Sequence, residues 1–260
     1  MSNWIKNTLC DLSAENLEHL LNFRIPGIRV ENFIPREVCE LISERVRGQS
    51  FQNYSHLKDI PVHQLGLCHN QYAHEDNSVY FSKKAEAQRV VYAIYDGLDV
   101  NPVEMVIEAL RTKADRRAGV FEEPGYGSYF AGAFRLFSGH GRLHVDHAPS
   151  HIKKPWAVTE ITRQMTWNIY YSVPESGGEL VIHDTIHNAE KDRLKVSGDY
   201  YFPYEVLDSD ERLVVLPKVG DLVIFNTQNF HEIFGNPNGL RISQTSFIGL
   251  RRDKSLGLWS

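Results

Sequence analysis

The sequence predicts an α+β, mainly β protein whose second half forms a sandwich or jelly roll beside supporting N-terminal helices. In the first half, up to residue 127, apolar residues recur mostly at helical spacing. From residue 128 onwards, short runs with β-type alternation follow one another, and glycine, asparagine and proline separate most of them. Many short strands without long helices between them indicate a sandwich or jelly roll and argue against a parallel α/β sheet.

The first half contains four expected helices around one expected strand. In DLSAENLEHLLNF, Ser13 is a plausible cap before helically spaced apolar residues. PREVCELISERVRG begins with Pro35 and ends at Gly48, the usual asymmetry of a helix. The run PGIRVENFI between these segments is the expected strand. Two further helices are expected at about 83–98 and 102–115, which are rich in Ala, Glu, Lys and Arg.

The second half contains the runs expected to form the strands of the jelly roll: SYFAGAFRLF, RLHVDH, QMTWNIYYSV, GELVIHD, ERLVVLP, GDLVIF, NFHEIF and LRISQTSFIGL. We expect one domain over residues 1–260. Its helical support and substrate rim span 1–127, its jelly-roll core spans 128–250, and its tail spans 251–260.

Composition narrows the class of protein. The chain has 42% hydrophobic residues and a net charge of −5, with no basic block and no apolar run of the roughly 20 residues that a membrane helix needs. These features argue against nucleic-acid and membrane partners. The N-terminus lacks a secretory signal pattern, so we expect a cytoplasmic protein. We further expect a monomer or homodimer. The three cysteines are far apart and suggest neither a disulfide framework nor a thiolate metal site.

The segment RLHVDH carries three side chains that can bind metal within four positions. The pattern His-x-acid is common by chance and also occurs at His74, but that copy lies in a polar stretch with turn residues. Strand alternation places His144 and Asp146 on one face, where both can reach one ion. A site there needs a third ligand. The alternative is a half-exposed strand whose polar face meets water.

A distal segment offers the missing ligand. GDLVIFNTQNFHEIFGNPNGLRISQTSF predicts a strand followed by a hairpin with its loop near 235–239. In both possible registers His231, Arg241 and Ser243 share a face. A guanidinium that points into a sheet interior requires an anion, and its planar fork suits a carboxylate. For either His231 or Arg241 alone, an ordinary structural role would be favoured.

These residues together resemble the Fe(II)- and 2-oxoglutarate-dependent oxygenases. The resemblance rests on His144-x-Asp146, the distal His231 and Arg241-x-Ser243, and on IYYSVPESGGELVIHD, which is similar to a segment of the prolyl-hydroxylase-like branch. It implies a double-stranded β-helix, a form of jelly roll. It also implies that His144, Asp146 and His231 bind Fe(II), while Arg241 and Ser243 bind the far carboxylate of 2-oxoglutarate.

The resemblance further implies use of O₂ and release of succinate and carbon dioxide as an unactivated C–H bond of an amino acid or specialised metabolite is hydroxylated. Bacterial relatives with VPEAGGEL-type segments include halogenases, in which glycine or alanine replaces the carboxylate ligand. Asp146 is present in this chain, which favours hydroxylation. Desaturation, epoxidation or cyclisation by the same cofactors is an alternative. A cupin-like metal-binding jelly roll without 2-oxoglutarate is another, although such a protein has no need of Arg241.

Several residues are weaker candidates for the site. Tyr171, or Asn168 and Tyr170 if the alternation runs the other way, would help to hold 2-oxoglutarate. His147, Tyr129 and Trp156 are the candidates for substrate contacts, from the segments on either side of the metal motif. The segment FEEPGYGSYF contains glycines, which suggests that it is mobile and could act as a lid. The remaining histidines His183 and His187 are expected to be surface groups.

Overall fold

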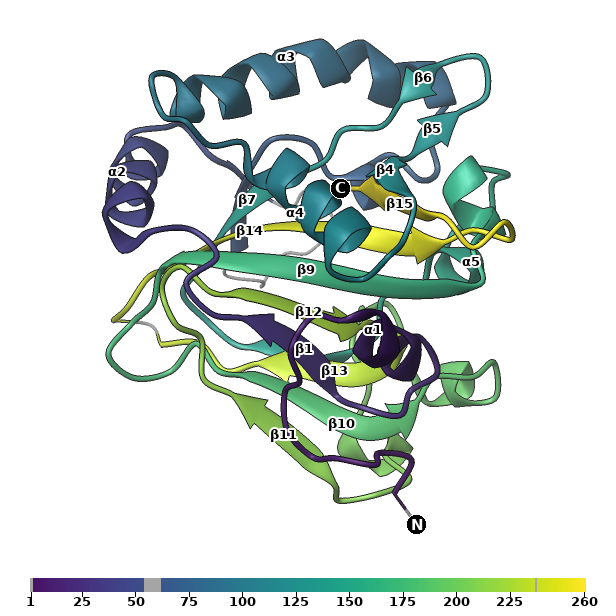
Figure 1. The fold of residues 1–260 in the computed structure, drawn as a ribbon. Helices are drawn as coiled ribbons and strands as arrows, with labels where there is room; N and C mark the ends of the chain where they lie inside the picture. Colours follow the sequence, from purple (N-terminus) through teal and green to yellow (C-terminus); the bar gives the residue numbers. More distant parts are fainter. Residues whose placement is uncertain (1, 54–61, 237) are drawn as a thin grey trace.

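A computed structural model describes residues 2–53, 62–236 and 238–260 of the chain. Two β-sheets face each other, and most of the helices lie on the outer side of the larger sheet (Figure 1). The predicted class, a mainly β jelly roll with N-terminal helical support, is confirmed. That the chain forms a single domain stays a prediction.

The larger sheet, called the major sheet below, has the strand order β1-β12-β9-β14-β7-β3-β2, and β15 joins β14 to β4. Its strands are β1 (Gly27–Val30), β2 (Gln52–Asn53), β3 (Val62–Leu65), β4 (Ala118–Val120), β7 (Ala133–Phe137), β9 (Arg163–Ser172), β12 (Leu222–Asn226), β14 (Arg241–Leu250) and β15 (Leu256–Trp259).

The smaller sheet, called the minor sheet below, has the antiparallel order β11-β10-β13-β8. Its strands are β8 (Gly141–His144), β10 (Leu180–Ile186), β11 (Arg212–Val215) and β13 (Asn229–Ile233). A separate hairpin pairs β5 (Glu122–Glu123) with β6 (Gly127–Ser128), within the segment that the sequence marked as a possible lid.

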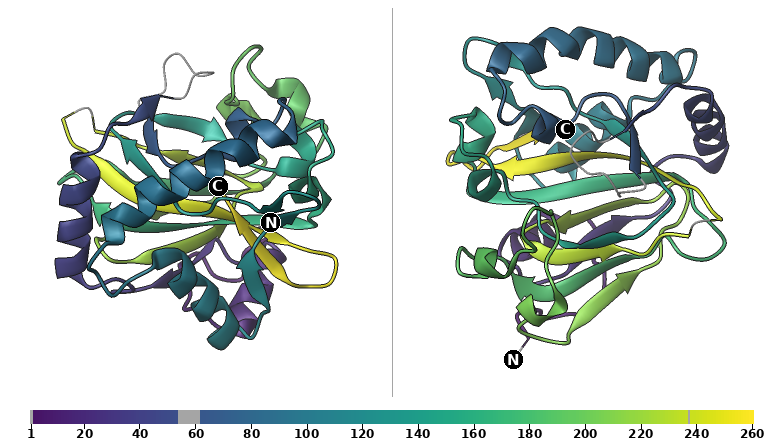
Figure 2. Two further views of the ribbon diagram at one scale, coloured as in Figure 1. Left: turned by 90° about the horizontal axis from the view of Figure 1, so that it is seen from above. Right: turned by 180° about the vertical axis from the view of Figure 1, so that it is seen from behind.

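The helices are α1 (Ala14–Leu21), α2 (Arg36–Arg47), α3 (Asn77–Tyr95), α4 (Pro102–Thr112) and the short α5 (Ala148–His151). The 3-10 turns are η1 (His69–Gln71), η2 (Ala157–Glu160), η3 (Lys191–Leu194) and η4 (Tyr204–Val206). Figure 2 shows α3 and the minor sheet on opposite sides of the major sheet. Ser13 caps α1 as predicted, since its side chain accepts a hydrogen bond from the Asn16 amide.

Strand β9 divides the interior into two environments because its side chains alternate between its two faces. Met165, Trp167, Ile169 and Tyr171 join the main hydrophobic core beneath the helices. On the opposite face Tyr170 packs between the two sheets with residues of β10 and β12. The same alternation therefore leaves Thr166 and Asn168 pointing toward the space between the sheets, where both line a cavity.

The predicted hairpin between His231 and Arg241 is wrong. Strand β13 pairs with β10 and β8 in the minor sheet, whereas β14 pairs with β7, β9 and β15 in the major sheet. The intervening segment is therefore an arch that carries the chain from one sheet to the other. It is tightly packed: a Cβ atom on Gly235 would collide with the Gly139 carbonyl, and one on Gly239 would overlap Pro174.

Candidate active site

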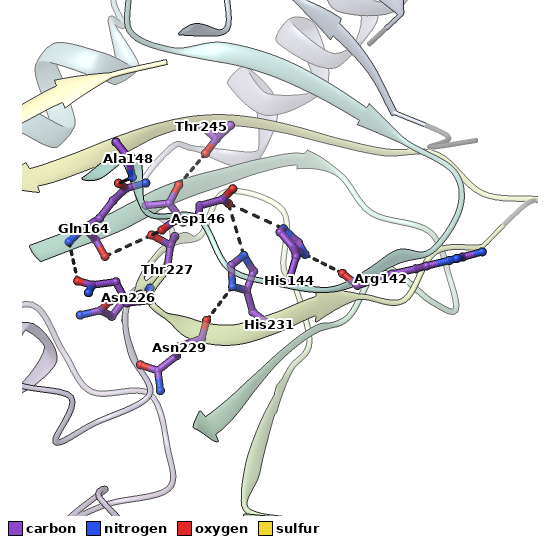
Figure 3. A network of polar contacts seen from close by, with 12 residues as sticks. Arg142, His144, Asp146, Ala148, Gln164, Asn226, Thr227, Asn229, His231 and Thr245 are labelled. Carbon is purple, nitrogen blue, oxygen red and sulfur yellow. Dashed lines mark hydrogen bonds and ion pairs between the residues drawn. The ribbon is translucent and has the colours of Figure 1, made fainter. Parts of the chain in front are cut away.

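The three predicted metal ligands meet at the open end of the minor sheet. His144 ends β8, Asp146 follows it, and His231 on β13 is the register partner of His144. The Nε2 atoms of His144 and His231 lie 3.8 and 3.7 Å from Asp146 Oδ2. Figure 3 shows both imidazoles directed toward this carboxylate. Two imidazoles and one carboxylate on one side of an open position form the donor set of non-haem Fe(II) oxygenases.

Hydrogen bonds fix which ring nitrogen of each histidine faces the site. His144 Nδ1 lies 2.7 Å from the Arg142 carbonyl oxygen, and His231 Nδ1 lies 2.9 Å from the Asn229 carbonyl oxygen. A carbonyl can only accept, so each Nδ1 carries the proton and each Nε2 keeps a lone pair toward Asp146. The backbone thus holds both rings in the orientation that a metal ligand requires.

The backbone of Asp146 is held by the loop that precedes β13. Its amide donates to the Thr227 carbonyl at 3.0 Å, and its carbonyl accepts from Thr227 Oγ1 at 2.8 Å (Figure 3). Two residues further on, the Ala148 amide donates to Gln164 Oε1 at 2.7 Å. These contacts extend the strand geometry beyond His144, so the carboxylate stays on the histidine face.

The protonation states of His144 and Asp146 suit the binding of a cation. Burial and the neighbouring His231 lower the pKa of His144 to about 4, which leaves the ring neutral near pH 7. Burial would raise the pKa of Asp146, but the imidazoles of His231 and His144 and the charge of Arg135 hold it well below its usual range. The site therefore presents the neutral imidazole of His144 beside one carboxylate anion.

A cavity of about 180 Å³ extends from these residues between the two sheets. Its walls include Asn168 on β9 and Arg241, Ser243 and Thr245 on β14. This volume is smaller than the roughly 300–1,000 Å³ of typical ligand pockets, which favours a small ligand. A larger groove of about 820 Å³ lies on the surface around 8–12, 29–31 and 213–218, but none of the candidate ligands lines it.

Arg241 is a buried cation in the wall of this cavity, with 3% of its surface exposed. Its guanidinium lies 4.9 Å from the centre of the Tyr170 ring, and Nη1 donates to the Gly178 carbonyl at 3.3 Å. Among the described residues, no carboxylate forms an ion pair with it and its Nε has no hydrogen-bond partner. A buried charge in this state calls for an anionic ligand, and the donor set fits the 2-oxoglutarate carboxylate.

The face of β9 that the sequence left open is now assigned. Asn168 lines the cavity, and Tyr170, on the same face, lies against Arg241. Tyr171 points the other way, into the main core, where its hydroxyl donates to Gln244 Oε1 at 2.9 Å. The prediction that Tyr171 holds 2-oxoglutarate is wrong because strand alternation turns it toward the helices.

Tyr129 and Trp156 are not placed for substrate contacts, since each is only 1% exposed. They belong to an aromatic cluster with His69, Tyr80 and Phe81. The Tyr129 hydroxyl donates to Glu123, and Trp156 Nε1 donates to the Ala73 carbonyl at 3.2 Å. The prediction for both residues is wrong because their polar atoms are satisfied within the core.

The other histidines differ from expectation as well. His147 does not line the cavity, and its Nδ1 lies 2.7 Å from Ser150 Oγ. His183 and His187, expected at the surface, are 2% and 7% exposed. His183 contacts the buried Glu232, and His187 contacts Asp192. His183 and His187 were expected at the surface because polar residues lie next to them in the sequence.

Arg135 and Tyr200 are among the cavity residues that the sequence reasoning missed. Arg135 on β7 is the register partner of Ser243 and therefore shares the cavity face of the major sheet. The sequence feature that could have indicated Arg135 is that it is the single cation in the apolar run AFRLF. Tyr200 reaches the cavity from the segment between β10 and β11 and packs edge-on against His144, with ring centres 5.6 Å apart. No motif in the sequence around Tyr200 indicates this contact.

Similar solved structures confirm the architecture. An N-substituted L-amino acid dioxygenase from Burkholderia ambifaria AMMD matches with a TM-score of 0.63 at 15% identity, over 95% of this chain and 91% of that one. Its complex with α-ketoglutarate gives a TM-score of 0.60 over the same shares, also at 15% identity. At this level of identity the similarity concerns the fold.

The fold and the donor set define a 2-oxoglutarate-dependent Fe(II) oxygenase, with the cofactors that the sequence resemblance implied. The family model described as carrier-protein-independent halogenase WelO5 matches residues 5–260, so the chain belongs to this family. No helix among the described residues is long and apolar enough to cross a membrane.

Two curated relatives match parts of the chain. Leucinostatins biosynthesis cluster protein S of Purpureocillium lilacinum is 34% identical over 129 residues, which cover 47% of this chain and 52% of that protein. The L-gamma-glutamyl-L-propargylglycine hydroxylase of Streptantibioticus cattleyicolor is 27% identical over 169 residues, 63% of this chain and 60% of that protein. The chain thus matches little more than half the length of each relative.

Proposed function

We propose that the protein hydroxylates an unactivated C–H bond of a small amino acid or amino-acid derivative, with Fe(II) held by His144, Asp146 and His231. The observation that carries this proposal is the carboxylate of Asp146 between two oriented imidazoles. With this carboxylate present, three protein side chains occupy three coordination positions of the metal. The position that is open to chloride when the carboxylate is missing is therefore filled. The relative named as a hydroxylase of an amino-acid derivative supports the substrate class.

The two walls of the cavity have different roles in this reaction: one holds the metal and the other binds 2-oxoglutarate. Iron with 2-oxoglutarate and O₂ supplies the oxidation of the C–H bond, with succinate and carbon dioxide as co-products. The backbone carbonyls behind His144 and His231 keep both Nε2 lone pairs on the metal side. Arg241 binds the far carboxylate of 2-oxoglutarate, while Ser243 and Asn168 contribute further polar contacts from the major sheet.

The cavity also selects for charge. Arg135 and Arg241 bring two guanidinium groups to one wall, which favours carboxylate-bearing ligands and disfavours cationic ones. The small volume excludes water once the cosubstrate and a small substrate are bound. An anionic amino-acid derivative meets both conditions.

Absorption spectroscopy tests the cofactor assignment. Fe(II) is added to the anaerobic protein, followed by 2-oxoglutarate, and the weak visible charge-transfer band of the chelate is recorded for wild type and Arg241→Ala. We expect a band only after both additions and a weaker band in the variant. Well-folded protein that binds Fe(II) but gives no band would favour the cupin-like alternative.

Product analysis then tests the reaction type. Amino acids and γ-glutamyl dipeptides are incubated with the enzyme, Fe(II), 2-oxoglutarate, air and chloride, and the products are examined by mass spectrometry. Gain of one oxygen atom in step with succinate release supports hydroxylation. Replacement of hydrogen by chlorine would make the protein a halogenase, and loss of two hydrogens would indicate desaturation or cyclisation.

A further inference from the structure

A second cluster of metal-binding side chains lies outside the oxygenase cavity. One nitrogen each of His151 and His187 and one carboxylate oxygen of Asp192 all lie within 4.8 Å of one another. None of these residues lines the cavity that contains His144. Two imidazoles and one carboxylate form a common donor set for zinc and neighbouring divalent ions.

Each member of the cluster is fixed by its own element. The His187 amide, directly after β10, donates to the Gln228 carbonyl at 2.8 Å. Asp192 lies in η3, whose buried Lys191 donates to the Val206 carbonyl and to Asp208, both at 2.7 Å. His151 is the last residue of α5, and its amide donates to the His147 carbonyl at 3.1 Å. The cluster therefore connects α5 with the segment 187–192, which lies far from α5 in the sequence.

The contacts within the cluster leave one imidazole nitrogen, His151 Nε2, free to coordinate a metal ion. His187 Nε2 lies 2.7 Å from Asp192 Oδ1, and the His187 side chain is only 2% exposed. The rings of His151 and His187 have centres 5.8 Å apart. His151 Nε2 is buried and has no hydrogen-bond partner among the described residues. A buried nitrogen without a partner is costly, and a bound cation would remove that cost.

We propose that His151, His187 and Asp192 bind a divalent first-row transition-metal ion, with zinc as the best match, at a site separate from the iron. Ligand atoms 2.0–2.1 Å from a tetrahedral ion lie about 3.3 Å apart, so small side-chain rotations close the site. Burial and Lys195 lower the pKa of His151, so this ring is neutral at pH 7 and can ligate. The negative charge of Asp192 offsets Lys195.

The ion would act as a structural clamp. The helix α5 begins two residues after Asp146, and His151 ends it. A metal that links His151 to His187 and Asp192 ties the segment behind the iron ligand to η3 and the end of β10. It therefore stabilises the loop that follows Asp146 without touching the reacting atoms.

Metal stoichiometry tests this inference and does not depend on the proposed function. Metal-free protein is equilibrated with low-micromolar Zn²⁺ by dialysis, and bound zinc is measured by mass spectrometry. We expect two equivalents for wild type, and one equivalent each for His144→Ala, Asp192→Asn and His151→Ala. His74→Ala, which removes an exposed histidine, should keep two. Asp192 is half-exposed, so Asp192→Asn should fold even if His151→Ala does not.

Cobalt provides an independent readout. Co²⁺ added to His144→Ala, in which the iron site is disabled, should give the intense visible bands of a four-coordinate ion, and the additional change Asp192→Asn should abolish them. A single zinc equivalent in wild type that is lost in His144→Ala and kept in Asp192→Asn would overturn the inference. So would a second equivalent that persists in both Asp192→Asn and His151→Ala, because zinc would then be bound elsewhere.

Discussion

The two sheets that face each other across the cavity carry different chemistry. The minor sheet places His144 and His231 as register partners and positions Asp146 just beyond β8. The major sheet presents Asn168, Arg241 and Ser243, with Arg135 beside them. Under the proposed function, the metal ligands therefore come from one sheet and the anion-binding groups from the other. Because the two sets lie on separate scaffolds, metal binding and cosubstrate binding should be separable by mutation.

The largest effect is expected on the minor-sheet side, from Asp146→Gly. Removal of the carboxylate takes away one of three protein ligands and should lower hydroxylation more than about 100-fold, since even residues that only support ligands can cost 10–100-fold. If chloride enters the opened position, a chlorinated product should appear. Products and succinate are measured with and without chloride. Full hydroxylase activity in this variant would refute the ligand assignment, and His74→Ala should behave as wild type.

On the major-sheet side, Arg241→Gln should weaken cosubstrate binding and leave metal binding intact. Loss of a charge-assisted contact of about 1.5–3 kcal/mol weakens 2-oxoglutarate binding roughly 10- to 150-fold, while Fe(II) binding stays near wild type. Titration calorimetry with each component measures both. Arg252→Gln, at an exposed arginine, is the control. Equal loss of iron and 2-oxoglutarate would contradict the division between the sheets.

Adjacent tyrosines on β9 test the alternation within the major sheet. Tyr171→Phe removes the hydrogen bond to Gln244 and should reduce the free energy of unfolding by about 1 kcal/mol without changing 2-oxoglutarate affinity. The Tyr170 hydroxyl is buried and has no partner among the described residues, so Tyr170→Phe should weaken 2-oxoglutarate binding several-fold. Denaturation and ligand titration of both variants distinguish the two faces. The opposite pattern would reverse the assignment.

The smallest effect on the cavity is expected from a residue outside both walls, His69 in the aromatic cluster, which should affect stability alone. Burial lowers its pKa to about 3, against 6.5 in the unfolded chain. Between these values the unfolded state binds the proton and the folded state does not, so stability falls as the pH drops from 6.5 toward 3, by about 1.4 kcal/mol per pH unit at most. His69→Phe should flatten this slope in urea unfolding. An unchanged slope would assign the acid sensitivity to other groups.

The sequence predicted the features that depend on local pattern. Helical spacing and caps predicted α1 and α2, and strand alternation placed His144 and Asp146 on one face. The shared cavity of His231, Arg241 and Ser243 was predicted for an incorrect reason, because parity within a hairpin was assumed where two sheets face each other. Tyr129, Trp156 and His187 could not be placed, since their burial depends on partners distant in the sequence. Arg135 is the single cation of AFRLF, but its place in the cavity depends on its register with Ser243, which the sequence alone does not give.

The arch between β13 and β14 joins the strand of His231 to the strand of Arg241. Its glycines pass so close to Gly139 and Pro174 that an added side chain has no room there. Under the proposed function, the separation of His231 from Arg241 would limit the length of the cosubstrate. A dicarboxylate shorter or longer than 2-oxoglutarate would lose contact with either the metal or the guanidinium. Selectivity for the cosubstrate would then be encoded in the spacing of the chain as much as in the identity of the side chains.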